Sequence, residues 1–541
     1  MNAKTVWIKK VLSGLALCAL AFGLILHPAY AEPDAPSATS GSYLGGDPYA
    51  DLAIGVPHES YGTTFDASGQ ISVLYSQWWG PSDTGNQVWM QGVDGILDGM
   101  EDYDNFGRVL ASGDFNGDNL PDLAIGVPYE DVGGVSDAGV VHIMYGMVDG
   151  LGSTGDQIWS DNDIGVTLAE VSDYFGYALA VGDFDGDGFD DLAIGAPQED
   201  VDGFINCGVV TTLYGTSSGL SRSGFRIWHQ DIPDIVGVRN DNDRFGDALA
   251  SGDFNGDGFE DLAVGVPTDD VGAINNAGVV NIIYGSEYGL SSVGNQIWYQ
   301  DSPNILDVSE TDDQFGSTLA AGDFNGDGKD DLAIGVPYED LDGIVDAGMV
   351  NVLYGSETGI SDTDQVWHQG IGLVPDDPEL NDRFGYSLAT GDFDADTYDD
   401  LAIGVPYESL DSVFNAGAIH IIYGTGGRLS VNGNQMFSQA VLGDWDTFGW
   451  SLAAGHFNGD GYEDLAIGAP RATVGGQVDA GEVSILYGFT PGLVTAGADT
   501  FDQNTPGILG TAEAGDYFGW SLAALEIDTY RTWIPLVMDH P

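Results

Sequence analysis

Basic side chains are scarce in this chain of 541 residues. Only 13 Lys and Arg stand against 85 Asp and Glu, which gives a formal net charge of −72 at pH 7. Because phosphate recognition depends on Lys and Arg, this balance argues against nucleic acid and anionic membrane surfaces as partners. Carboxylates at this density repel one another unless cations lie between them, and hard divalent cations prefer oxygen ligands. The composition therefore points to bound cations.

Cysteine is almost absent. Of the two residues, Cys18 lies in an N-terminal apolar run and Cys207 stands alone in the rest of the chain. One cysteine cannot form an internal disulfide, so the fold is not stabilised by cross-links. Cys207 occupies a repeat position that is Ala in other copies, which predicts a small buried residue and not a nucleophile.

Long apolar runs are missing except near the N-terminus. Three lysines (Lys4, Lys9 and Lys10) precede the apolar run 11–26, and Ala29-Tyr30-Ala31 gives an A-x-A cleavage site. This pattern predicts a signal peptide over 1–31 and a short linker over 32–41, with a retained anchor as the alternative. No later segment reaches membrane-spanning length. We therefore expect a secreted or extracytoplasmic protein at the cell surface, and the lack of disulfides and N-x-S/T sequons favours a bacterial one.

Helical periodicity is also lacking, and an internal repeat takes its place. Each unit reads in the same order: a Phe-Gly pair, LA-x-GDF, an acidic loop, DLAIGVP, AG-x-V-x-x-x-YG and a segment resembling Q-[IV]-W-x-Q. The short apolar runs between Gly, Asp, Asn and Pro predict four strands per unit. The Phe-Gly pairs begin at Phe106, Phe175, Phe245, Phe315, Phe384, Phe448 and Phe518, and the G-[VA]-P segments at Gly55, Gly126, Gly195, Gly265, Gly335, Gly404 and Gly468.

The two series of motifs are out of phase. The chain starts with a G-V-P segment that lacks its Phe-Gly and ends with a Phe-Gly that lacks its G-V-P. Joining the two half-units gives a seventh copy and removes exposed sheet edges. The sequence thus predicts an all-β, seven-bladed β-propeller of four-stranded blades over 42–530, followed by a tail over 531–541. A β-solenoid is the competing fold, but its usual repeat is much shorter.

The acidic loop after the first strand of each unit carries the chemistry. Oxygen-bearing side chains stand at loop positions 1, 3, 5 and 9, and position 7 offers a backbone carbonyl, which together suit calcium. The alternative is that these residues form ordinary Asp/Asn turns, in which the side chains hydrogen-bond only to their own backbone. The five complete sets are Asp114, Asn116, Asp118, Leu120 and Asp122; Asp183, Asp185, Asp187, Phe189 and Asp191; Asp253, Asn255, Asp257, Phe259 and Asp261; Asp323, Asn325, Asp327, Lys329 and Asp331; and Asp392, Asp394, Asp396, Tyr398 and Asp400.

Two loops depart from this pattern, and none is an EF-hand. Position 12, which should then be Glu, is Ile194 inside a strand-like run. His456 holds position 1 of a sixth loop, whose other ligands would be Asn458, Asp460, Tyr462 and Asp464; imidazole suits calcium poorly, so we expect a weak or empty site. In the split unit, Glu526 and Asp528 would combine with Asp47 and Asp51 in a composite site that joins the chain ends.

These motifs resemble the FG-GAP repeats of the integrin α-subunit propeller, and they are similar to repeats of glycosylphosphatidylinositol phospholipase D. The resemblance covers roughly residues 42–528. It implies calcium in the acidic loops on one rim and a ligand face on the opposite rim. On that opposite rim an acid follows the Pro by two residues in six units, at Glu59, Glu130, Glu199, Asp269, Glu339 and Glu408. These acids would either attract a basic or metal-bridged partner or form a solvated rim.

A binding or adhesion scaffold for a protein or glycan ligand is the function that this reading favours. The alternative is a propeller associated with a phospholipase D-like hydrolase, without a catalytic domain of its own. The eight His are scattered, and the G-x-S-x-G match around Ser217 has no helix after it, so we expect no enzyme. A subunit of a larger surface assembly is a third alternative. No residue identifies the ligand.

Overall fold

The structure is a computed structural model that describes residues 49–61, 66–164, 169–410, 412–439, 441 and 443–526. The predicted signal peptide, linker and tail lie outside these residues, as do Asp47 and Asp528. Within the described part no helix is long and apolar enough to cross a membrane.

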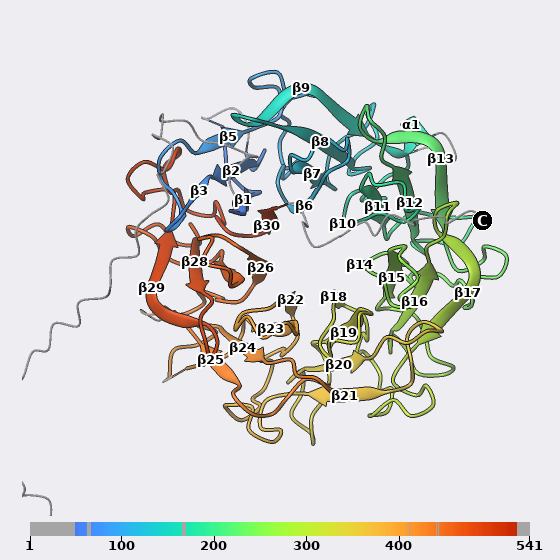
Figure 1. Ribbon diagram of the computed structural model, residues 1–541. Coiled ribbons are helices and arrows are strands. Elements are labelled where there is room, and N and C mark those ends of the chain that lie inside the picture. Colours follow the sequence, from blue (N-terminus) through green and yellow to red (C-terminus); the bar gives the residue numbers. More distant parts are fainter. Residues whose placement is uncertain are drawn as a thin grey trace, which may run out of the picture. The chain divides into compact units, whose positions relative to one another are not determined.

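Seven four-stranded antiparallel sheets contain every strand of the described part except β3 and β4, and Figure 1 shows them arranged in a ring. This confirms the predicted all-β propeller. A two-stranded hairpin, β3 (Ser76–Gln77) and β4 (Gly80–Pro81), and the short helix α1 (Asp161–Ile164) are added to them. From first to last strand, the blades are β30 (Leu522–Leu525), β1 (Asp51–Val56), β2 (Gln70–Leu74) and β5 (Gln87–Trp89); β6 (Val109–Gly113), β7 (Asp122–Val127), β8 (Val140–Met147) and β9 (Gly150–Trp159); β10 (Ala178–Gly182), β11 (Asp191–Ala196), β12 (Val209–Tyr214) and β13 (Ser221–Trp228); β14 (Ala248–Gly252), β15 (Asp261–Val266), β16 (Val279–Tyr284) and β17 (Ser291–Trp298); β18 (Thr318–Gly322), β19 (Asp331–Val336), β20 (Met349–Leu353) and β21 (Asp364–Trp367); β22 (Ser387–Gly391), β23 (Asp400–Val405), β24 (Ala418–Ile422) and β25 (Gln435–Phe437); and β26 (Ser451–Gly455), β27 (Asp464–Ala469), β28 (Glu482–Tyr487) and β29 (Val494–Phe501).

The core lies between neighbouring blades. The DLAIG-type second strands are buried along their whole length, because both of their faces pack against other blades. One cluster joins Phe115 and Ile143 of one blade to Phe175 and Ile194 of the next. The Val/Ile/Leu runs of the repeat are therefore the interblade core, and no blade could bury both of its faces alone.

The Phe-Gly and G-[VA]-P motifs meet across each interface. A Cβ added to Gly126 would lie 2.2 Å from the carbonyl oxygen of Gly176, which belongs to the next blade. The amide of Phe175 also donates to the carbonyl of Ala138 in the preceding blade, at 3.0 Å. Only glycine allows this close approach of two backbones, which explains why the motifs recur together.

The ring closes as the out-of-phase motifs predict. Strand β30 from the C-terminal half-unit pairs antiparallel with β1 from the N-terminal half-unit, with Leu525 opposite Asp51 and Leu522 opposite Ile54. This pairing supplies the innermost strand of the seventh blade and covers the edge that β1 would otherwise expose.

A tyrosine at the end of each third strand ties its blade to the next. The Tyr284 hydroxyl donates to Gln296 Oε1 at 2.6 Å and accepts the amide of Ile360 in the next blade at 3.2 Å. Equivalent hydroxyl groups accept the amides of Leu151, Leu220, Leu290, Leu429 and Leu493. At the seventh interface the position is Pro81, which has no N–H, and the Tyr487 hydroxyl donates within its own blade instead, to Asp499 at 2.6 Å.

Candidate cation sites and ligand face

The acidic loops bring their carboxylates together. In the β10–β11 loop, oxygens of Asp183, Asp185 and Asp191 all lie within 4.8 Å of one another. Asp191 is fully buried at the start of β11, where it accepts the amides of Phe184 at 3.0 Å and Gly215 at 2.8 Å. Hydrogen bonds thus fix the carboxylate at position 9 before any ion binds.

Burial and like charge act together on this carboxylate. Burial is the main reason that the pKa of Asp191 rises to about 9, and the charges of Asp185 and Asp183 add to it. A bound cation would relieve both effects. Burial is also the main cause at the equivalent acids, whose pKa values rise to between about 8 and about 9. These acids are Asp122, Asp261, Asp331, Asp400 and Asp464.

The residues present fit a hard divalent cation. All side-chain donors of the five complete loops are oxygens or Asn amides, which suit calcium. Asp394 Oδ1, at position 3 of the β22–β23 loop, is buried and has no hydrogen-bond partner among the described residues. An orphaned carboxylate oxygen of this kind is costly unless an ion or a proton satisfies it.

The five loops are not equivalent. Where position 3 is Asn, its amide donates to the position 9 carboxylate, as from Asn325 to Asp331 at 3.2 and 3.0 Å. These amide hydrogens offset part of the negative charge. In the same loop the Lys329 ammonium lies 3.6 Å from Asp327, so a cationic side chain competes with an ion there.

Neighbouring loops are linked around the rim by the acid at position 8. Asp190 accepts the amide of Asp114 in the preceding loop at 2.7 Å, and Asp330 and Asp399 accept those of Asp253 and Asp323 at 2.8 Å each. The sequence motifs did not predict this role for position 8, although an acid recurs there in five units. Where position 8 is such an acid, the loop therefore helps to hold position 1 of the loop before it.

The blade that the two chain ends form together lacks this link and has another contact in its place. Position 8 is Ala50, and Glu526 instead accepts the His456 amide at 3.1 Å and lies 2.9 Å from His456 Nδ1. The hydrogen bond to Glu526 raises the pKa of His456 and so favours the imidazolium form. Asp51 is buried and accepts the Ser76 amide at 2.6 Å. With Asp47 and Asp528 outside the described residues, the composite site and the weak sixth site stay predictions.

The six acids of the opposite rim are not a solvated ring. Glu130, Glu199, Glu339 and Glu408 are 1 to 2% exposed and Asp269 is 5% exposed. In five units a Gln from the preceding blade donates to the acid, as Gln91 does to Glu130 at 2.7 Å. The solvated-rim interpretation is therefore wrong, because the acid turns inward to the interblade junction.

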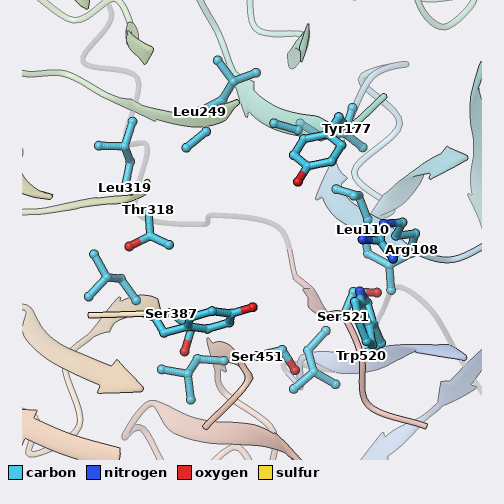
Figure 2. Close-up of a pocket in the computed structure, with 18 of the residues that line it drawn as sticks. Arg108, Leu110, Tyr177, Leu249, Thr318, Leu319, Ser387, Ser451, Trp520 and Ser521 are labelled. Atoms are coloured by element: carbon cyan, nitrogen blue, oxygen red, sulfur yellow. The ribbon is translucent and has the colours of Figure 1, made fainter. Parts of the chain in front are cut away.

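The mouth of the central channel carries aromatic and arginine side chains. The innermost strands of all seven blades line a cavity of about 320 Å³, and Figure 2 shows Arg108, Tyr177 and Trp520 around it. Arg108 lies 4.9 Å from the Trp520 ring and 5.0 Å from the Tyr129 ring. Trp450 lies 4.8 Å from Trp520.

The cluster extends around the mouth. Arg383 lies between the rings of Tyr338 and Tyr407, at 4.8 and 4.7 Å, and Tyr386 packs on Trp450 at 4.9 Å. We call the set Arg108, Tyr129, Tyr338, Arg383, Tyr386, Tyr407, Trp450 and Trp520 the aromatic–arginine cluster.

The repeat motifs alone did not predict this cluster. Its members stand directly before or after a Phe-Gly pair or directly after the Pro, so reading the variable positions beside those motifs would have found it. These positions precede the innermost strand or follow the second one, and the cluster therefore lies at the rim opposite the acidic loops.

The residues weighed as catalytic are dispersed or buried. His142 and His420 are fully buried in β8 and β24, and burial lowers their pKa values to about 4 and about 3. Cys207 is 1% exposed, as predicted. Ser217 lies in a turn whose Gly219 amide bonds the carbonyl of Thr216, and the next element is strand β13.

Comparison with known proteins places this architecture among repeat proteins. The FG-GAP repeat matches residues 106–144, 175–211, 245–282, 315–353, 384–422 and 448–486. Human phosphatidylinositol-glycan-specific phospholipase D is 31% identical over 54% of this chain and 34% of its own length. Integrin alpha-PS2 of Drosophila melanogaster is 34% identical over 44% of this chain and 16% of its own length. The chain thus spans only a minor part of these relatives.

A solved structure was also matched. The exotype rhamnogalacturonan lyase YesX is 14% identical, with a TM-score of 0.38 over 88% of this chain and 83% of the lyase.

Proposed function

The chain is built from FG-GAP repeats, and we propose that it is an exported, calcium-binding propeller that serves as a binding or adhesion scaffold at or outside the cell surface. Its ligand, a protein or a glycan, would bind on the rim opposite the acidic loops. The aromatic–arginine cluster is the observation that carries this proposal.

The composition of the cluster supports a binding face. Trp, Tyr and Arg are the residues most enriched at the energetic centres of interfaces, because they combine large apolar area with directed polar contacts. Eight such residues gather around one channel mouth of a chain with only 13 Lys and Arg. The rings stack on one another and on the two guanidinium groups, so the surface is preorganised and loses little entropy on binding.

Calcium would serve the scaffold and not the ligand directly. The acidic loops lie at the other end of each innermost strand, and links such as Asp190 to Asp114 connect them around the ring. Ions in these loops would neutralise their carboxylates and hold the blades in register. The similarity to integrin alpha and phospholipase D regions supports this assignment.

Ligand binding is tested on a glycan array and by capture of surface proteins, both in calcium. Trp520→Ala should weaken binding of any ligand found by tenfold or more, since truncating a central interface residue commonly costs at least about 1.4 kcal/mol. Trp79→Ala is the matched control, because Trp79 is 49% exposed outside the cluster, on the β3–β4 hairpin. Equal losses for both variants, or none for Trp520→Ala, would contradict the proposed face.

A propeller associated with a hydrolase is the second candidate, favoured by the similarity to the phospholipase. We propose that this chain has no catalytic activity of its own. Cleavage of phosphatidylinositol-glycan anchors by the purified chain would overturn that part of the proposal.

Export is tested by cell fractionation. The mature protein should be found outside the cytoplasm and begin at residue 32, which N-terminal sequencing would show. A protein that keeps residues 1–31 would support the retained anchor instead.

A further inference from the structure

One interblade junction on the rim opposite the acidic loops has a carboxylate where the six others have a glutamine. At five junctions a buried Gln near the end of a blade donates its amide to the acid of the next blade, at 2.7 Å from Gln91 to Glu130 and 2.6 Å from Gln230 to Asp269. The other donors are Gln300, Gln369 and Gln503. At the junction between the β6–β9 and β10–β13 blades the residue in this place is Asp161.

This substitution removes a donor and adds a charge. Carboxylate oxygens of Asp161, Asp173 and Glu199 all lie within 4.8 Å of one another, and the three side chains are 6%, 1% and 2% exposed. Asp161 Oδ2 and Glu199 Oε2 are buried and have no hydrogen-bond partner among the described residues. No basic side chain of the described part forms an ion pair with any of the three.

Asp173 accepts the backbone amide of Glu170, but the unpartnered oxygens of Asp161 and Glu199 still need a small positive species. Desolvated charges of one sign are costly unless they are neutralised, and one proton shared by the three groups would still leave two negative charges. Burial excludes a Lys or Arg from a partner protein, whereas a bare ion fits. Oxygen ligands alone select a hard cation such as calcium over zinc, which favours nitrogen and sulfur.

We propose that Asp161, Asp173 and Glu199 form a divalent-cation site, with calcium as its ion, that joins these two blades on the ligand-face rim. It is separate from the acidic loops in residues and in position, since its ligands come from α1, the segment before β10 and the segment after β11. The ion would take the place that a glutamine amide takes at five other junctions.

The other junctions supply the test variant. Asp161→Gln recreates their arrangement, so the variant should fold, and its amide should donate to Glu199. Calcium bound per chain, measured by equilibrium dialysis and elemental analysis, should fall by one. Glu170→Gln is the control, because Glu170 is an exposed neighbouring acid outside the cluster. It should leave the calcium count unchanged.

The melting temperature in chelator is a second measurement, in which the substitution should stabilise the chain. Without calcium, Asp161→Gln should melt at a higher temperature than the natural chain, because it lacks the third buried charge. With calcium this advantage should shrink or reverse. An equal calcium count for Asp161→Gln and the natural chain would overturn the proposal, and would mean that protons neutralise the cluster.

Crystals of the natural chain soaked in manganese provide a measurement that needs no variant. An anomalous peak between the three carboxylates is expected, and its absence while the acidic loops show peaks would overturn the site alone. If a peak appears between the three carboxylates but none appears in the acidic loops, the assignment of calcium to the loops is contradicted instead.

Discussion

Replacing Tyr284 by Phe tests how the blades are held together. The change removes one hydroxyl group and keeps the ring. It leaves the Ile360 amide of the next blade and the Gln296 side chain without the partners they have at 3.2 and 2.6 Å. The hydrogen bond to Ile360 is buried, so water cannot replace the lost partner without opening the interface.

The expected cost follows from that buried amide. An unsatisfied buried donor costs about 1–3 kcal/mol, and an ordinary hydrogen bond contributes about 1 kcal/mol net. Tyr284→Phe should therefore lower the free energy of unfolding by about 2 kcal/mol.

Tyr487→Phe is the matched control within the same chain. The residue it faces across the interface is Pro81, which has no amide hydrogen, so the variant loses only the bond to Asp499, a partly exposed residue that water can reach. Its cost should stay below about 1 kcal/mol. Urea unfolding and thermal melting in calcium measure both variants. Equal destabilisation by the two substitutions would refute the tether.

Three further predictions concern other parts of the ring. Elemental analysis should show that Asp191→Asn binds one calcium fewer per chain and that Asp464→Asn binds as many as the natural chain. An equal loss in both variants would contradict the prediction that the loops bind calcium unequally. Burial raises the pKa of Glu130 to about 9, so folding binds a proton there, and stability should fall as pH rises from about 5 to 9. Glu130→Gln should flatten that slope in melting curves, by at most about 1.4 kcal/mol per pH unit, and an unchanged slope would count against it. Leu525→Ala truncates a side chain that is 1% exposed in the closing strand and leaves a cavity, so it should lower the free energy of unfolding in urea by about 2–5 kcal/mol. A cost near zero would contradict closure through β30.

The fold could be predicted in nearly every respect, because the repeat reports the same constraints seven times. Gly126 must be glycine since the Gly176 carbonyl of the next blade lies where its Cβ would be. Such positions stay invariant from copy to copy, and the phase of the motifs at Gly55 and Phe518 revealed how the ring closes.

The functional surfaces were harder to predict because they depend on positions that vary between copies. Glu130 looked like a surface acid in the sequence, and only the packing of the next blade shows that it turns inward to Gln91. The cluster around Trp520 joins residues that are distant in sequence, at positions beside the repeat motifs where the residue type changes from copy to copy. Likewise, the pairing of Glu526 with His456 follows from Ala50 standing where other loops have an acid.

The most direct measurement of the calcium claim is the melting temperature of the mature chain with calcium and with a chelator. Each ion held at a hundred times its dissociation constant adds about 2.7 kcal/mol to the folded state. With five complete loops, calcium should raise the melting temperature by many degrees and the chelator should reverse it. A midpoint that is the same in calcium and in chelator would contradict calcium as a structural part of this propeller.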